Sequence, residues 1–339
     1  MSYRIGFDAI HLRPGPRLAH TEYCSNDRLM SAVREETGQA FEDAWDIDFL
    51  WSVDDGPVPW AERGRCTDMG HAEFLEGGVD RRAAQSSPFT DPEQVLTFDA
   101  VEEYGLTDFD ELVAHYEEHY QKHQQAHPNQ VFTAGYYKTI VSGAIEAFGW
   151  EMLLLGAVDL ARFEKVLDSI YRLSLHHYKA WAQTSAPVFI SHDDMVWSEG
   201  PFLDPAFYRA VIFPRYKELW KVLKDAGKKV LYCSDGDFTL FIDDVVEAGA
   251  DGLIFEPMTS LERVVEHYGN THCIVSSKVD CRTLTFGTRD QIRTEIDATL
   301  EVAFDCPGFM FAVGNHIPSN VPFENARFYI DYLRQNWAR

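Results

Sequence analysis

Residues 229–236 read KVLYCSDG, a short apolar run that ends in a thiol, a hydroxyl, a carboxylate and a glycine. Similar runs recur along the chain, separated by amphipathic stretches with helical periodicity such as 205–226 and 289–303. The predicted strands are 48–53, 131–136, 188–191, 229–233, 252–255, 272–276 and 308–313. Because a crossover follows each strand, the sheet should be parallel. No Gly-x-Gly-x-x-Gly follows the first strand, so the pattern favours a (β/α)8 TIM barrel over a doubly wound open sheet.

The chain before residue 128 is less regular, because turn-forming residues interrupt its apolar runs. No repeat or linker divides the sequence, and α/β barrels of this length commonly fold as one unit. We therefore expect a single domain over residues 1–339, with an irregular N-terminal extension at 1–45 and the barrel at 46–339.

A polar helix is predicted at residues 102–125, and its His115, His119 and His123 recur at a spacing that puts them on one face. A histidine stripe can bind a metal ion. Among so many charged and amide neighbours, however, a solvated helix surface is the favoured interpretation.

Composition excludes several classes of protein. The formal charge of −24 would repel nucleic acid and anionic lipid, and no apolar run is long enough to cross a bilayer. The N-terminus has no apolar export segment, so we expect a cytoplasmic protein that binds neither nucleic acid nor membrane. Six cysteines without a Cys-x-x-Cys pair argue against a disulfide framework and against a zinc ribbon.

Polar side chains follow six of the predicted strands, at the ends where a parallel barrel carries its chemistry. They are Asp54 and Asp55; His192, Asp193 and Asp194; Cys233, Ser234 and Asp235; Glu256; Asp280 and Cys281; and Asn315 and His316. Barrel geometry should bring them to one mouth. Helix capping by Asp193 or Asp194 is an equal alternative, as is a simple turn at Asp54 before Gly56.

Three of these side chains are typical of a zinc site. A thiolate, a carboxylate and an imidazole, here Cys233, Glu256 and His316, form a normal set of zinc ligands that leaves a fourth position open. Aromatic residues near the strand ends could line a substrate pocket, although ordinary barrel packing explains them equally well. These aromatic residues are Trp51, Tyr136, Tyr137 and Trp197.

Residues 185–335 resemble the uroporphyrinogen decarboxylase superfamily, which holds the haem-pathway decarboxylase and a set of zinc methyltransferases linked to corrinoid proteins. The resemblance rests on Asp193-Asp194, on GPFLDP at 200–205, on AGKKVLYCSDG at 226–236, on EAGADG at 247–252, on Val279-Asp280, and on GNHIP at 314–318 with VPFEN at 321–325. Residues 1–125 match only loosely.

The methyltransferase branch is the nearer of the two. The decarboxylase carries Arg-Gln-Ala-Gly-Arg-Tyr near its N-terminus to hold substrate carboxylates, and the corresponding residues 17–23 read RLAHTEY. The CSDG sequence around Asp235 resembles a subgroup with His-Ser-Asp-Gly, in which Cys233 would replace the histidine, and Glu256 lies in a similar Phe-Glu-Pro context.

The resemblance therefore implies zinc-assisted methyl transfer between a small methylated substrate, such as a methoxy or methylamine compound, and a thiol or the cobalamin of a corrinoid partner protein. Zinc would be held by Cys233, Glu256 and His316, and a homodimer is one assembly open to such a chain. The expected catalytic residues are Asp55, Asp193, Asp194, Asp235 and Asp280, and the expected substrate-binding residues are Trp51, Tyr136, Tyr137, His192, Trp197 and Asn315. The alternatives are a decarboxylase that uses Asp55 to stabilise charge, and a barrel that binds a ligand without catalysis.

Overall fold

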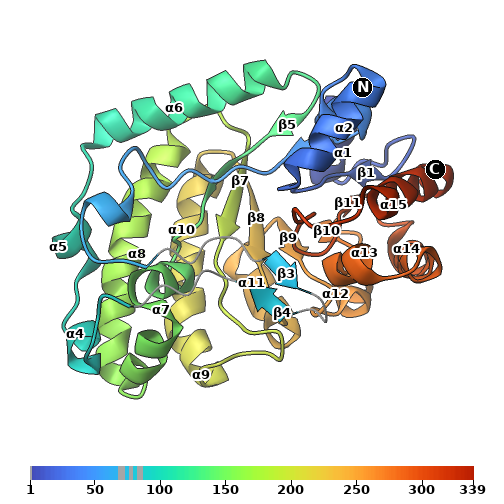
Figure 1. Ribbon diagram of the computed structural model, residues 1–339. Coiled ribbons are helices and arrows are strands. Elements are labelled where there is room, and N and C mark those ends of the chain that lie inside the picture. Colours follow the sequence, from blue (N-terminus) through green and yellow to red (C-terminus); the bar gives the residue numbers. More distant parts are fainter. Residues whose placement is uncertain (1, 68–72, 76–78, 82–86) are drawn as a thin grey trace.

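The computed structural model describes the chain except for residues 1, 68–72, 76–78 and 82–86, and it contains a ring of parallel strands inside a layer of helices (Figure 1). Seven strands form one sheet in the order β1-β11-β10-β9-β8-β7-β6. Their bounds are β1 Ala19–His20, β6 Ala134–Tyr136, β7 Val188–His192, β8 Lys229–Ser234, β9 Gly252–Phe255, β10 Cys273–Ser276 and β11 Phe309–Phe311. Each neighbouring pair is parallel.

β2 (Phe49–Leu50) occupies the eighth position and closes the ring between β1 and β6. It pairs in parallel with β5 (Val131–Phe132), which runs directly into β6. On its other side the Asp48 amide donates to the His20 carbonyl over 2.8 Å, and beyond β2 the Asp54 amide donates to the Gly135 carbonyl over 3.1 Å. The fold is therefore a (β/α)8 barrel, as the sequence predicted.

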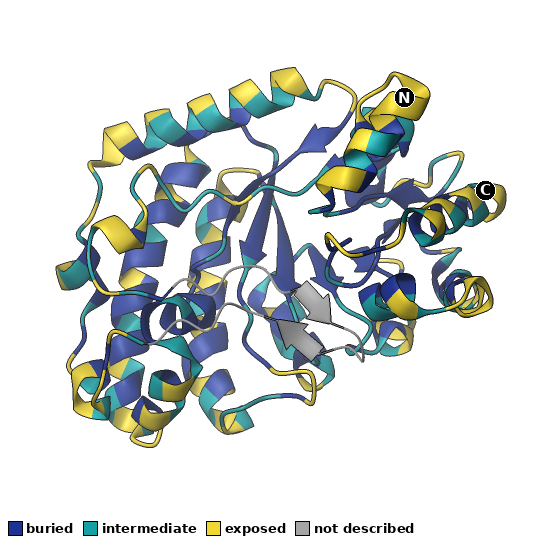
Figure 2. Cartoon of the chain, viewed as in Figure 1, coloured by how far each residue is buried: buried dark blue, intermediate teal, exposed yellow. Residues whose placement is uncertain are grey.

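The helices that follow the strands cover the outside of the barrel, with their exposed faces outward and their buried faces against the strands (Figure 2). The α-helices are α1 Ser2–Ile10, α2 Asp27–Thr37, α3 Phe41–Ala44, α4 Pro92–Leu96, α5 Ala100–Tyr104, α6 Phe109–Ala126, α7 Val141–Gly156, α8 Leu160–Ala182, α9 Pro205–Phe207, α10 Phe213–Asp225, α11 Ile242–Ala248, α12 Leu261–Tyr268, α13 Cys281–Phe286, α14 Arg289–Ala303 and α15 Phe323–Asn336. Short 3-10 turns lie at Trp60–Glu62 and Thr239–Phe241, a π turn at Tyr208–Ile212, and an antiparallel hairpin at β3 Glu73–Leu75 and β4 Val79–Arg81. Among the described residues, no helix combines the length and the apolar character needed to cross a bilayer.

Each of the seven predicted strand regions contains a strand, several of them shorter than predicted, and the region 131–136 contains two, β5 and β6. Two further differences concern β1 and the helix expected at 102–125. β1 lies within residues 1–45, so the barrel takes one of its strands from the predicted extension. The helix expected at 102–125 is two helices, because Gly105 adopts a positive φ of 69° after α5, and Asp108 then caps the backbone of α6.

The barrel interior follows from the alternation of side chains along each strand. In β7, Val188 and Ile190 face inward, whereas Phe189 packs against the helices. Near the start of β2, a Cβ on Gly6 would overlap the Asp48 carbonyl oxygen, so α1 packs tightly there. Apolar side chains of α1 join the interior cluster, while polar side chains gather where the strands end.

Candidate active site at the barrel mouth

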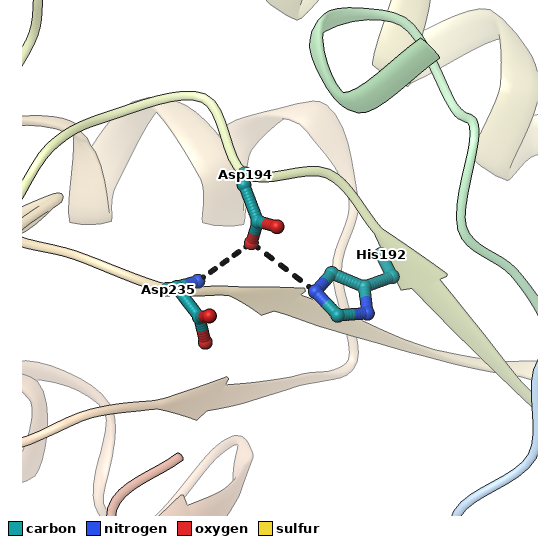
Figure 3. Close-up of side chains that lie close together, drawn as sticks. All are labelled: His192, Asp194 and Asp235. Atoms are coloured by element: carbon teal, nitrogen blue, oxygen red, sulfur yellow. Dashed lines mark hydrogen bonds and ion pairs between the residues drawn. The ribbon is translucent and has the colours of Figure 1, made fainter. Parts of the chain in front are cut away.

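His192, Asp194 and Asp235 lie close together where β7 and β8 end (Figure 3). The two strands pair with His192 opposite Cys233, so the residues that follow them meet at the same edge. One Asp194 oxygen accepts the backbone N–H of Asp235 over 2.9 Å and lies 3.1 Å from His192 Nε2. One ligand atom from each of the three side chains lies within 4.8 Å of the other two, and within the described ranges this is the group of acids, thiols and imidazoles that could hold a metal ion.

The two ends of the His192–Asp194 contact carry opposite charges. Burial opposes a charged imidazole, but the neighbouring Cys233 and Asp194 raise the pKa of His192 well above its usual 6.5. Burial also works against the Asp194 carboxylate, yet the charge and hydrogen bond of His192 hold the pKa of Asp194 below its usual value. Burial raises the pKa of Cys233, although the charge and the hydrogen bond of His192 oppose this shift.

Tyr137 connects this pair to the end of β2. Its hydroxyl donates to the second Asp194 oxygen over 3.2 Å, and its backbone N–H donates to Asp55 over 2.9 Å. The other Asp55 oxygen lies 3.4 Å from the Lys138 ammonium. Tyr137 thus contacts Asp55 through its backbone and Asp194 through its hydroxyl, and so links the ends of β2, β6 and β7.

On the other side of the mouth, Asn315 joins two carboxylates. Its amide nitrogen donates to Asp235 over 3.0 Å and to Glu256 over 3.1 Å. Glu256 also accepts the Gly236 N–H over 2.7 Å, and burial raises the pKa of Glu256. Asn315 has a left-handed backbone with φ of 66°, a conformation that asparagine tolerates better than most residues.

A small cavity opens beside these groups, between the ends of β2, β8, β9 and β11. Its polar and aromatic lining consists of Trp51, Cys233, Ser234, Asp235, Phe255, Glu256 and Asn315. Trp51 is held in place by a hydrogen bond from its indole N–H to Thr21 over 2.8 Å. Glu256 and Asp235 line this cavity, and Asp235 also belongs to the His192–Asp194–Asp235 group.

The predicted zinc ligands do not form a converging set. Cys233 faces the barrel interior and lines the cavity, and both Glu256 oxygens accept N–H groups. His316 is buried, with its ring nitrogen hydrogen-bonded to Asn315 and its ring 6.1 Å from that of Tyr23. Cys233 and Glu256 line the cavity, whereas His316 does not.

Two other predicted residues face away from the mouth. Asp193 is fully buried and accepts the Tyr216 hydroxyl and the Ser142 N–H, each over 2.6 Å, so it caps the first turn of α7. Burial raises its pKa to about 6. Tyr136 lies in the layer between β6 and α8, where it stacks on His177 at 4.8 Å.

Asp280 and Trp197 lie at the edges of the site. Asp280 caps α13 and is paired with the Arg282 guanidinium, whose Nε lies 2.9 Å from it. Trp197 is half-exposed in the loop after β7, beside Trp150 and Phe202 at 5.6 Å each. Neither residue lines the cavity.

Two histidines of the α6 stripe, His115 and His119, contact the barrel while remaining partly exposed. Asp54 lies 2.9 Å from His115 Nε2 and 3.1 Å from His119 Nδ1, and Ser52 contacts His119 Nε2 over 3.1 Å. These contacts fasten the loop that carries Asp55. The four-residue spacing was visible in the sequence, but nothing in it indicated that a carboxylate would lie opposite.

The mouth is acidic, and the cationic groups among its described contacts are already paired. Lys138 is paired with Asp55, Arg282 with Asp280, and His192 with Asp194. Arg17, the first residue of the segment that corresponds to the Arg-Gln-Ala-Gly-Arg-Tyr of the decarboxylase, binds Asp48 inside the fold.

The sequence comparisons with known proteins agree on one family. The family model described as uroporphyrinogen decarboxylase (URO-D) matches residues 152–336. The uroporphyrinogen decarboxylase of Syntrophotalea carbinolica is 28% identical over 204 residues, which cover 60% of this chain and 57% of that protein. The uroporphyrinogen decarboxylase of a Thermus thermophilus strain is 25% identical over 175 residues, covering 52% and 49%. The chain thus spans about half the length of the curated relatives it matches.

Solved structures with a similar arrangement include D-psicose 3-epimerase from Clostridium cellulolyticum, with a TM-score of 0.37 and 12% identity, covering 72% of this chain and 90% of that one. A putative vitamin-B12-independent methionine synthase from Listeria monocytogenes has a TM-score of 0.40 and 12% identity, covering 96% and 99%.

Proposed function

Because the chain belongs to the uroporphyrinogen decarboxylase family, we propose that it is an enzyme that removes a carboxyl group from a small substrate at the barrel mouth. The curated relatives named above support the reaction type. The structural observation that carries the proposal is the group of acids at the strand ends. Tyr137 contacts both Asp55 and Asp194, and Asp194 accepts the N–H of Asp235, which lines the cavity together with Glu256.

Decarboxylation leaves an electron pair on carbon, which must be delocalised and then protonated. Asp55, anchored by the Tyr137 N–H and by Lys138, would stabilise the positive charge of the group that takes up this electron pair. Glu256 lines the cavity, and because burial raises its pKa, it is suited to hold the proton that replaces carbon dioxide.

The charges at the mouth limit the substrate. Each carboxylate brought into a buried site without a cation costs on the order of several kcal/mol, and here Lys138, Arg282 and His192 already have acidic partners. Arg17 is likewise committed to Asp48. We therefore propose a substrate with few carboxylates, and we expect uroporphyrinogen to be left unchanged.

Methyl transfer is the second candidate, and one observation favours it. His192, Asp194 and Asp235 present an imidazole and two carboxylates at an acidic mouth that would accept a neutral or cationic methylated compound. A bound zinc ion would supply Lewis-acid chemistry at these ligands. The methyl acceptor would be a thiol or the cobalamin of a separate corrinoid protein.

One experiment separates the two reactions. The purified protein is mixed with a panel of pyrroles and aromatic acids bearing one or two carboxyl groups, and with uroporphyrinogen, and released carbon dioxide is measured. A parallel series supplies cob(I)alamin with methoxy, methylamine and methylthio compounds, and methyl-cobalt absorbance is followed.

We expect carbon dioxide from at least one small acid. Its release should be lost in Asp55→Asn and retained in the control Asp297→Asn, whose carboxylate contacts Tyr332 on the outer helices. Fast conversion of uroporphyrinogen would contradict the proposed substrate class. Methyl-cobalt formation without carbon dioxide release would replace the proposal with its alternative.

A further inference from the structure

We propose that His192, Asp194 and Asp235 bind a divalent transition-metal ion, with Mn²⁺ and Zn²⁺ as the ions that suit this donor set best. This set differs from the Cys233–Glu256–His316 set that the family resemblance implies. The role of the ion toward a carboxylated substrate rests on the proposed function, whereas binding of the ion itself does not.

The three ligand atoms already converge from two strand ends. They lie within 4.8 Å of one another, whereas ligands about 2.1 Å from a common ion lie about 3 Å apart. Side-chain rotations that move these atoms by about 1 Å would close the gap without moving the strands. The backbone holds the positions, because the Asp235 N–H donates to Asp194 over 2.9 Å and the Asp194 N–H donates to Ser142 over 2.7 Å.

The donor types select the class of ion. One imidazole with two carboxylates is a borderline-to-hard set, which suits Mn²⁺ or Zn²⁺ better than the softer Cu⁺. The Tyr137 hydroxyl donates to the Asp194 oxygen that does not contact His192, and such an outer hydrogen bond orients a ligating carboxylate.

The surrounding charge also favours a cation. Asp235 and Glu256 share the single neutral amide of Asn315, and Asp194 lies one hydrogen bond from Asp235. Carboxylates gathered at a partly buried site are costly unless positive charge compensates them. Binding through the His192 ring would displace its proton, so a divalent ion would add one net positive charge to this group.

The coordination positions of the ion that the three side chains leave free would face the cavity. Asp235 lines the cavity together with Glu256 and Asn315, so water or a substrate oxygen could reach an ion at this edge. Catalytic metal sites keep such a position open, whereas structural sites are closed by protein ligands. The ion would also provide the positive charge that a substrate carboxylate does not find in Lys138 or Arg282, both of which are paired.

Binding is tested directly on the full chain by titration calorimetry with Mn²⁺ and with Zn²⁺, and by loss of the electron paramagnetic resonance signal of free Mn²⁺. We expect about one ion per chain, and affinity should fall by roughly tenfold or more in Asp235→Asn and in His192→Gln. Asp237→Asn is the matched control, because Asp237 lies two residues beyond Asp235 and its side chain accepts the Thr239 N–H. Thermal melts verify that each variant is folded.

A second control addresses the other histidine cluster. His115→Gln removes the α6 contact to Asp54 and should leave metal affinity unchanged. Absence of binding to the wild type, or loss in His115→Gln with retention in Asp235→Asn, would overturn the proposal. Metal binding without carbon dioxide release would leave the site standing and contradict only the proposed reaction, whereas release that is unaffected in a metal-free Asp235→Asn protein would remove the ion from that reaction.

Discussion

Arg17 and Asp48 meet through two parallel hydrogen bonds, one of 2.7 Å from Nη1 to Oδ2 and one of 2.8 Å from Nη2 to Oδ1. Asp48 is completely buried and also accepts the His20 N–H over 2.9 Å. Burial raises the pKa of Asp48 even though Arg17 opposes the shift. The guanidinium also lies over the Trp337 ring at 4.5 Å, so the pair fastens β1, β2 and the C-terminal segment together.

Removing one partner of this pair should be far more harmful than removing both. Arg17→Met leaves a buried carboxylate without its cation, and we expect a loss of about 3–5 kcal/mol in the free energy of unfolding. The double variant Arg17→Met, Asp48→Asn should recover part of that loss. Urea unfolding curves measure both changes, and equal stability of wild type and Arg17→Met would contradict the structural role.

Gly135→Ala should weaken the closure of the barrel. A Cβ at this position would overlap the carbonyl oxygen of Ser52, at the point where β6 passes the chain beyond β2. We expect a loss of about 1–3 kcal/mol, as for other overpacked sites. Gly15→Ala is the control, because its closest contact would be 3.3 Å from the Arg17 carbonyl. Thermal melts of the two variants should differ clearly.

His177 should make the protein less stable in mild acid. Burial is the main cause that lowers its pKa to about 3, and Tyr116 Oη lies 2.6 Å from its Nδ1. The unfolded chain takes up this proton near pH 6.5, while the native protein does not, so stability is lost as the pH falls from 6.5 toward 3. At pH 5 the cost reaches about 2 kcal/mol.

The variant His177→Gln should flatten this part of the stability profile. Denaturant midpoints at pH 7 and pH 5 give the comparison between variant and wild type. An equally steep decline in the variant would assign the acid sensitivity to other groups.

Two substitutions at Asn315 separate its backbone from its amide. Asn315→Gly tolerates the positive φ of 66° but removes the donor shared by Asp235 and Glu256. Asn315→Ala loses the donor and is also strained, so it should be less stable than the glycine variant by roughly 1–2 kcal/mol. Equilibrium unfolding measures the difference, and equal stabilities would mean that the loop relaxes around alanine.

The barrel was predictable because seven of its strands are runs of apolar, strand-forming residues followed by crossovers. β1 was missed because it contains only Ala19 and His20, too short a segment to produce a pattern. The prediction of one helix at 102–125 was wrong for a local reason, because α5 ends at Gly105 and Asp108 caps the start of α6.

The sequence predicted that the candidate site lies at the strand ends, but it did not predict the direction of each side chain. Parallel strands that end on one face of the barrel bring four residues to its mouth: Asp194, Asp235, Glu256 and Asn315. Side-chain direction does not follow, because neighbours in an extended chain point opposite ways: Asp193 caps α7 while Asp194 faces the mouth, and Tyr136 faces α8 while Tyr137 contacts Asp194. Composition alone cannot resolve this one-residue difference.

The position of β1 between β2 and β11 also matters while the protein is being made. His20 pairs with Phe311, so β1 leaves the ribosome long before its partner strand β11 has been translated. Until then the open sheet has unpaired strand edges at both sides, and such edges are prone to pair with other chains. Translation beyond Phe311 is therefore the step at which the barrel first becomes able to close, and a pause before it would prolong the period in which the chain depends on protection by chaperones.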